Sequence, residues 1–464
     1  MKNGGSRYQR LIWALCAAGA LGCNVGPNYE RPKVASPDNF RGAAAPSKES
    51  LADEKWSVLL PDETLRQLVQ SALAHNYDLL VAANRVLQAE AELGITNADR
   101  LPNLSAQAGA GVQRTRQFTG TPQRVQSYQL QGTLAWELDF WGKFRRASEA
   151  ARANLLGSEW GRRAVVTSLV SSVASSYFRL RALDRQLEIS QRTLSSRQES
   201  LRLTQVRDQG GAGSLVDVRQ AEQLVEGANA TIVALSASIQ QQENAIAVLL
   251  GQFPGPVARG QALEAQAVRL DVPAGLPSSL LERRPDIQQA EQALVAANAG
   301  IGVAKAAYFP QIDLTASGGV ASTSLSTLFS TPAIVWSAAA SLVQPIFDGG
   351  RISSQVTRAE LGREQAALEY QRTIQQAFRE VADALSGYQS GREARDIQER
   401  LVRSASDARR LADMRYQGGN SSYLEVLDSD TRLFEAELGL VGAELNERSA
   451  FVEIYRALGG GWQG

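Results

Sequence analysis

The chain repeats itself over long distances. The segment VRDQGGAGSLVDV at 206–218 returns as MRYQGGNSSYLEV at 414–426. Adding 208 to a residue number also takes Asp78 to Asp286 and Pro102 to Pro310 without a gap. A period of this length is far longer than that of a solenoid unit. The sequence therefore predicts two copies of one architecture, at 62–251 and 279–458, joined by a linker at 252–278 and followed by a short tail at 459–464.

Charge and motif content exclude several classes of function. The 464 residues include 48 basic and 48 acidic side chains and one histidine. A net charge near zero leaves no basic footprint for nucleic acid, and one histidine cannot build a multi-histidine metal site. The sequence contains neither a Gly-Lys-Ser/Thr phosphate loop nor a Gly-x-Ser-x-Gly elbow. We therefore expect no enzyme, metal or cofactor, and we expect His75 to be a solvated or hydrogen-bonded side chain.

The N-terminus has the form of an export signal. Three basic residues precede an apolar run at 11–22, which is too short to span a bilayer comfortably. The following Ala20-Leu21-Gly22-Cys23 resembles the lipobox of bacterial lipoproteins. It predicts a signal peptide at 1–22, a lipid on Cys23 and an extended lipidated segment at 23–61. Asn24 resembles the signal for transfer to the outer membrane, and the alternative is an ordinary buried cysteine.

Disulfides are not expected to stabilise the mature chain. The second cysteine, Cys16, lies within the segment that the signal peptidase would remove. Stability must then come from packing or from oligomerisation.

Each repeat is predicted to contain one helix, two strands and two long helices. In the first repeat a helix at 63–99 stops before Pro102, and strands at 104–113 and 128–139 alternate apolar with polar residues. The second repeat supplies strands at 311–322 and 334–347. Strands of about ten residues suit a membrane span.

Four membrane strands cannot close on themselves. A small barrel needs about eight strands, and an open edge is not tolerated in lipid. Several chains would therefore share one barrel. The aromatic residues Trp136, Trp141 and Trp336 near the strand ends favour this interpretation. The alternative is a four-stranded soluble sheet packed on helices.

Long helical segments follow the strands. The segments 143–208 and 351–416 contain no proline, and a helix of about 65 residues would reach about 100 Å. With return helices at 214–250 and 422–458 they predict antiparallel hairpins of coiled-coil type. The repeated turn then lies at each hairpin tip. There Gly210 and Gly211 would end one helix, and Ser214 with Asp217, like Ser422 with Glu425, would form a capping box that begins the next.

Five motifs in order carry a resemblance to a known family. They are GPNYERP at 26–32, LDFWGK at 138–143, RPDI at 284–287, AYFP at 307–310 and PIFDGGR at 345–351. Together they resemble the TolC/OprM family of outer membrane factors, in its lipoprotein branch. The resemblance implies a mainly helical fold with membrane β-strands. It implies a homotrimer with a twelve-stranded outer-membrane β-barrel, which continues as a periplasmic α-helical tunnel.

The same resemblance implies function and partners. A lipid-anchored protein of the Gram-negative outer membrane, extending into the periplasm, would be the exit duct of a tripartite efflux pump for drugs or other small molecules. Its partners would be a periplasmic adaptor and an inner-membrane transporter of the resistance-nodulation-division type. The alternatives are an exit duct for type I protein secretion and a non-conducting structural coiled-coil lipoprotein.

Two sets of residues are candidate sites under this resemblance. Adaptor docking is expected at the tips, through Gly210, Gly211, Gly213, Ser214, Gly418, Gly419 and Ser422. A periplasmic gate is expected at Glu425 and Asp428, which share a helix face because they stand three apart. In a trimer each would form a ring of carboxylates, which favours cations in a pore. The alternative is that Glu425 completes a capping box and Asp428 pairs with Arg432.

Overall fold

The computed structural model describes residues 24–34, 37, 39–42, 50–115, 123–266, 273–275 and 277–462. The predicted signal peptide and Cys23 lie outside these ranges. The chain forms two compact units, and each unit contains segments from both repeats. Unit 1 comprises Met1–Lys33, Arg85–Ser158 and Gln289–Gln371. Unit 2 comprises Val34–Asn84, Glu159–Gln288 and Arg372–Gly464.

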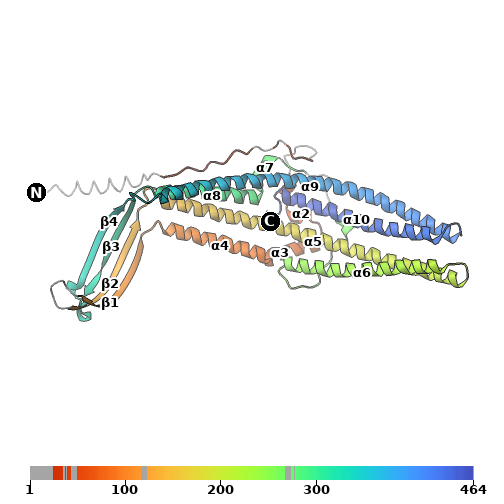
Figure 1. Ribbon diagram of the computed structural model, residues 1–464, viewed down its shortest axis with the longest axis horizontal. Coiled ribbons are helices and arrows are strands. Elements are labelled where there is room, and N and C mark those ends of the chain that lie inside the picture. Colours follow the sequence, from red (N-terminus) through yellow and green to blue (C-terminus); the bar gives the residue numbers. More distant parts are fainter. Residues whose placement is uncertain are drawn as a thin grey trace. The chain divides into compact units, whose positions relative to one another are not determined.

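The helices of the two repeats match, which confirms the duplication (Figure 1). Residues 208 apart bound α4 and α8, α5 and α9, and α6 and α10. A short α2, Trp56–Leu59, precedes the repeats. The first repeat contains α3 (Glu63–His75), α4 (Tyr77–Ala98), α5 (Lys143–Gln209) and α6 (Leu215–Leu249). The second contains α7 (Pro277–Arg283), α8 (Pro285–Ala306), α9 (Arg351–Gln417) and α10 (Tyr423–Ala457).

The first helix of the repeat is broken, contrary to the prediction of one helix over 63–99. Asn76 adopts an extended conformation between α3 and α4. Its side chain accepts a hydrogen bond from the Leu79 amide at 3.1 Å and donates one to the Leu249 carbonyl at 3.0 Å. In the second repeat the break falls 208 residues later at Arg284, which donates to the Ala457 carbonyl at 3.0 Å. In each repeat, the residue at the break therefore hydrogen-bonds through its side chain to the C-terminal end of the last helix of that repeat.

The four strands form one antiparallel sheet in unit 1, in the order β1-β2-β3-β4 (Figure 1). They are β1 (Asn103–Thr115), β2 (Gln123–Glu137), β3 (Gln311–Ser322) and β4 (Ile334–Val343). The central pair, β2 and β3, comes from different repeats. Strand pairing therefore joins the two copies into a single sheet.

The helical hairpins pack against each other near their tips in unit 2. Tyr423, Val426 and Leu427 of α10 form a buried apolar cluster with Ala221 of α6 and Ala412 of α9. Burial raises the pKa of the Tyr423 hydroxyl to about 12. Among the helices within the described ranges, none combines the length and the apolar character needed to cross a bilayer.

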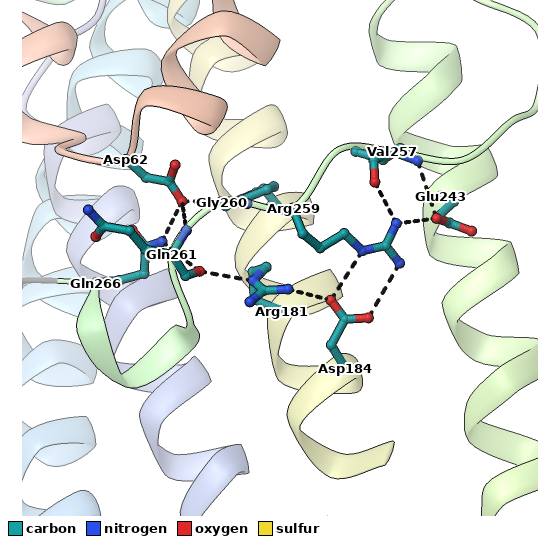
Figure 2. Close-up of polar contacts among 10 residues, drawn as sticks. Asp62, Arg181, Asp184, Glu243, Val257, Arg259, Gly260, Gln261 and Gln266 are labelled. Atoms are coloured by element: carbon teal, nitrogen blue, oxygen red, sulfur yellow. Dashed lines mark hydrogen bonds and ion pairs between the residues drawn. The ribbon is translucent and has the colours of Figure 1, made fainter. Parts of the chain in front are cut away.

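The segment between the repeats is fastened to the helices of unit 2 (Figure 2). Asp62, which caps α3, accepts hydrogen bonds from the Gln261 amide at 3.0 Å and the Gln266 side chain at 2.6 Å. The Arg259 guanidinium contacts the carboxylates of Asp184 on α5 and Glu243 on α6. These bonds hold the linker against three helices of the first repeat.

Candidate functional site

The strand register gives the sheet two chemically different faces. Directly paired residues share a face, and every pairing in the sheet joins residues of the same parity. All even-numbered strand residues therefore lie on one face, and this face is mainly apolar. Its apolar members include Leu104, Ala106, Ala108, Ala110, Val112, Tyr128, Leu130, Leu134, Trp136, Leu314, Ala316, Val320, Ile334, Trp336, Ala338, Ala340 and Leu342. We call this the even face.

The odd face is mainly uncharged and polar. Its members include Ser105, Gln107, Gln113, Ser127, Gln129, Gln131, Thr133, Thr315, Ser317, Ser337 and Ser341. A sheet with one apolar and one polar face matches the alternation of transmembrane barrels, in which lipid covers the outside and water the lumen.

The even face has the height of a bilayer core. On β1 the ten steps from Leu104, the first apolar residue of the even face, to Arg114, the charged residue that bounds it, span about 33 Å at about 3.3 Å per residue. A tilt of about 35–45° reduces this to about 25 Å, the height of the apolar band of outer-membrane barrels. Both the length and the apolar character of the even face therefore match the lipid-facing band of an outer-membrane barrel.

Aromatic side chains mark both ends of the sheet. At the end where strands meet helices, Trp136 donates to the Arg100 carbonyl at 3.0 Å. Trp141 donates to the Pro310 carbonyl at 2.7 Å and stacks on Phe309 with ring centroids 4.7 Å apart. At the other end Trp336 is 79% exposed on the even face. Interfacial aromatic girdles have this arrangement.

The sheet leaves two edges open within the described chain. Its order gives β2 and β3 two neighbours each, but β1 and β4 one each. One row of backbone groups on β1 and one on β4 is therefore available to strands of another molecule.

The tips of the hairpins are built on glycine. Gly211 has φ +71° and Gly419 has φ +73°, whereas Gly210 and Gly418 keep negative φ values. The Ala212 amide donates to the Arg207 carbonyl at 2.8 Å, and the Asn420 amide to the Arg415 carbonyl at 2.8 Å. These bonds close a Schellman-type turn at each tip. The left-handed residue is thus the second glycine of each pair.

Both predicted capping boxes are wrong. The Ser214 hydroxyl accepts a single bond from the Val216 amide at 3.2 Å, so it caps the second rather than the third helical residue. Ser422 makes no side-chain capping bond, and its carbonyl accepts the Glu425 amide instead. The Glu425 carboxylate lies 3.7 Å from the Arg415 guanidinium, so an ion pair across the turn replaces the box.

The predicted gate residues are exposed on α10. Asp428 accepts a hydrogen bond from Arg432 at 2.7 Å, and this bond holds the pKa of Asp428 below its ordinary value. Within one protomer the ion-pair alternative for Asp428 is therefore present. The carboxylate rings of a trimer stay a prediction.

The segment at 24–33 belongs to unit 1 and is bonded to the other segments of that unit. Cys23 itself is outside the described residues. The Val25 amide donates to the Trp141 carbonyl at 3.2 Å, and Arg146 donates to the carbonyls of Val25 and Gly26. Tyr29 and Arg31 both donate to the buried Glu291. The GPNYERP motif is therefore a strap that fastens the N-terminal segment to α5, through Arg146, and to α8, through Glu291.

Sequence reasoning missed a buried charged cluster near the tips. Asp430 on α10 accepts hydrogen bonds from Arg197 on α5 and Arg409 on α9. His75, in contrast, is placed as expected: it is exposed and its ring lies 3.0 Å from the Ser71 carbonyl.

The chain is similar to known proteins over nearly its whole length. The model of the family described as outer membrane efflux protein matches the chain twice, at 68–252 and 276–460. The chain is 35% identical to the cation efflux system protein CusC of Escherichia coli O6:H1, over 97% of the chain and 98% of that protein. It is 36% identical to the probable efflux pump outer membrane protein TtgC of Pseudomonas putida, over 95% and 93%. The open-state outer membrane channel MtrE of Neisseria gonorrhoeae superposes with a TM-score of 0.87 at 33% identity, covering 95% of this chain and 99% of that one.

Proposed function

The chain belongs to the outer membrane efflux protein family and is an outer-membrane efflux channel that extends into the periplasm, and from this premise we propose that three copies form one conducting unit. The observation that carries the proposal is the two-faced sheet with open edges on β1 and β4. In lipid those edges need partners, and four strands are too few to close. The open edges require several copies, and the family supplies the number three, because its members act as trimers. Three sheets of four strands would close as one twelve-stranded barrel.

In this assembly the even face contacts lipid and the odd face lines the conduit. The Ser, Thr and Gln side chains of the odd face suit a water-filled lumen that passes small solutes without a fixed charge preference. A lipid on Cys23 would add a second attachment to the outer membrane.

The partners follow from the family and from the tips. We propose that the glycine turns at 210–214 and 418–422 dock a periplasmic adaptor, which connects the channel to an inner-membrane transporter of the resistance-nodulation-division type. The exposed shape of each turn is set by its left-handed glycine and by the Schellman bonds. The cargo is drugs or other small molecules, because one relative in Pseudomonas putida is the antibiotic efflux pump outer membrane protein ArpC.

A pair of neighbouring substitutions tests the channel. Ala338 lies on the even face of β4 and Ala339 on the odd face. An arginine on the lipid side near the bilayer midplane costs about 2–4 kcal/mol. Ala338→Arg should therefore reduce the amount of trimer inserted in the outer membrane. Ala339→Arg should insert normally and change the ion selectivity of single channels in planar bilayers.

The outcomes separate the alternatives. A wild-type protein that inserts but gives no conductance would favour the non-conducting structural lipoprotein. Reversed effects of the two arginines would overturn the assignment of the faces. Complementation of a secretion-defective strain, with no restoration of drug resistance in an efflux-defective one, would favour the type I secretion duct.

A further inference from the structure

Two arginines lie opposite each other at the outer end of the even face. Arg114 of β1 and Arg124 of β2 are direct cross-strand partners, and both are exposed. Their parity places them on the same face as Val112 and Tyr128. We propose that Arg114 and Arg124 form a binding site for the phosphate groups of an anionic lipid in the outer leaflet. The inference rests on the proposed membrane orientation of the sheet.

The local charge is uncompensated in the sequence. From residue 101 to residue 136 the chain contains no aspartate or glutamate, and Arg116 adds another positive charge in the same stretch. From 314 to 347, which includes β4 and most of β3, it contains no charged residue of either sign. The carboxylates of Glu137 and Asp313 belong to the other end of the sheet, where β2 and β3 meet the helices.

Like charges on directly opposed strand positions repel each other. Cβ atoms of such a pair lie about 4.5–5.5 Å apart, and like charges there destabilise the sheet. An anion between the two guanidinium groups would remove this repulsion. Arginine also binds phosphate through two parallel N–H···O bonds, so two adjacent arginines suit a phosphorylated headgroup better than isolated lysines would.

The position on the strands identifies a lipid rather than a dissolved anion. Arg114 comes directly after the apolar even-face residues of β1, at the end of the strand away from the helices. The helices extend into the periplasm, so this end faces the outer leaflet. There the acyl chains of a lipid can cover the apolar face while its phosphate contacts the arginines. A free phosphate ion would gain only the second of these interactions.

Binding of diphosphorylated lipid A to the purified full-length trimer tests the site. The ligand would be titrated in detergent and its binding followed by native mass spectrometry. Arg114→Gln with Arg124→Gln should weaken binding at least tenfold, whereas Arg114→Lys with Arg124→Lys should give an intermediate loss. A matched control, Arg202→Gln with Arg219→Gln, removes the same charge from exposed positions on α5 and α6 and should leave binding unchanged.

Three results would overturn the assignment. The first is equal affinity of the wild type and the double glutamine variant. The second is equal loss in the control variant, which would indicate a general charge effect. The third is competition by millimolar inorganic phosphate, which would indicate a free-anion site. Conductance in planar bilayers distinguishes failure of the lipid site from failure of the proposed channel. The double glutamine variant should still conduct. A wild-type protein without conductance would contradict the channel itself.

Discussion

Arg197 donates a hydrogen bond to Asp430 at 2.8 Å, and this buried ion pair ties α5 of the first repeat to α10 of the second. Arg409 of α9 contacts the other carboxylate oxygen of Asp430 at 3.3 Å. Arg197 also donates to the Leu224 carbonyl of α6 at 3.0 Å. One carboxylate and its two arginines therefore connect all four helices of the hairpins.

Removal of Asp430 should loosen the hairpins. Asp430→Ala leaves two arginines without their shared partner in a buried site, and breaking such a pair typically costs about 3–5 kcal/mol. We expect a lower thermal unfolding temperature and faster hydrogen exchange in the distal halves of α5 and α10. Asp407→Ala serves as the control, because Asp407 and Arg410 form an exposed ion pair. Such a pair contributes little to the free energy of unfolding. Equal behaviour of the two variants would contradict a structural role for the Asp430 cluster.

The sequence predicts those parts of the molecule that leave a repeat, an alternation of apolar and polar residues or a short motif in the chain. The shift of 208 predicts paired helices, and alternation predicts strands that the structure confirms at Gln311–Ser322. The Asp430 cluster has no such signal, because its arginine at 197 is 233 residues away and looks like part of a solvated helix face. The break at Asn76 has a local signal, because asparagine is a preferred N-cap and its side chain accepts the Leu79 amide of α4. Its second bond, to the Leu249 carbonyl, lies in another helix and has no signal in the sequence.

The second prediction concerns the tips. Gly211 and Gly419 have left-handed backbones, and a Cβ at either would meet nothing within 4 Å. Gly211→Trp has room for its side chain but strains the left-handed backbone by about 1–2 kcal/mol. We expect the trimer to assemble despite this local strain, and adaptor binding and efflux to fall because an exposed surface is changed. Gly211→Asn should retain both, since asparagine tolerates the left-handed conformation. Pull-down of the adaptor and drug-susceptibility assays would measure the effect, and loss of trimer in the tryptophan variant would assign the glycine to folding.

Lipidation of Cys23 is the third prediction. Cys23→Ala should abolish metabolic labelling with palmitate, whereas Cys16→Ala, within the predicted signal peptide, should not. The GPNYERP strap is held by protein contacts such as Tyr29 and Arg31 on Glu291, so a channel assembled without lipid should keep its conductance. Palmitate labelling that persists in the Cys23 variant would show that the lipobox interpretation is wrong.

Asp62 should contribute to acid sensitivity. Burial alone would raise the pKa of this carboxyl, but hydrogen bonds from Gln266, Tyr177 and backbone amides together hold it below its ordinary value. A carboxyl with a depressed folded-state pKa stabilises the fold above its unfolded pKa of about 3.9, and this contribution is lost as the pH falls through the folded-state value. Asp62→Asn should lower the thermal unfolding temperature at pH 7. It should also make the decrease of that temperature below pH 4 less steep than in the wild type. Glu90→Gln, an exposed change on α4, should alter neither.

The last prediction is the acidic gate at Glu425 and Asp428. In a threefold assembly each residue occurs three times near the second tip, and a ring of carboxylates attracts cations. Glu425→Ala with Asp428→Ala should raise single-channel conductance and weaken block by multivalent cations. Because Arg432 now neutralises Asp428 through a bond of 2.7 Å, Arg432→Ala should act in the opposite direction and strengthen cation block. Unaltered conductance and block in both well-folded variants would assign Asp428 to its ion pair with Arg432 and Glu425 to its contact with Arg415.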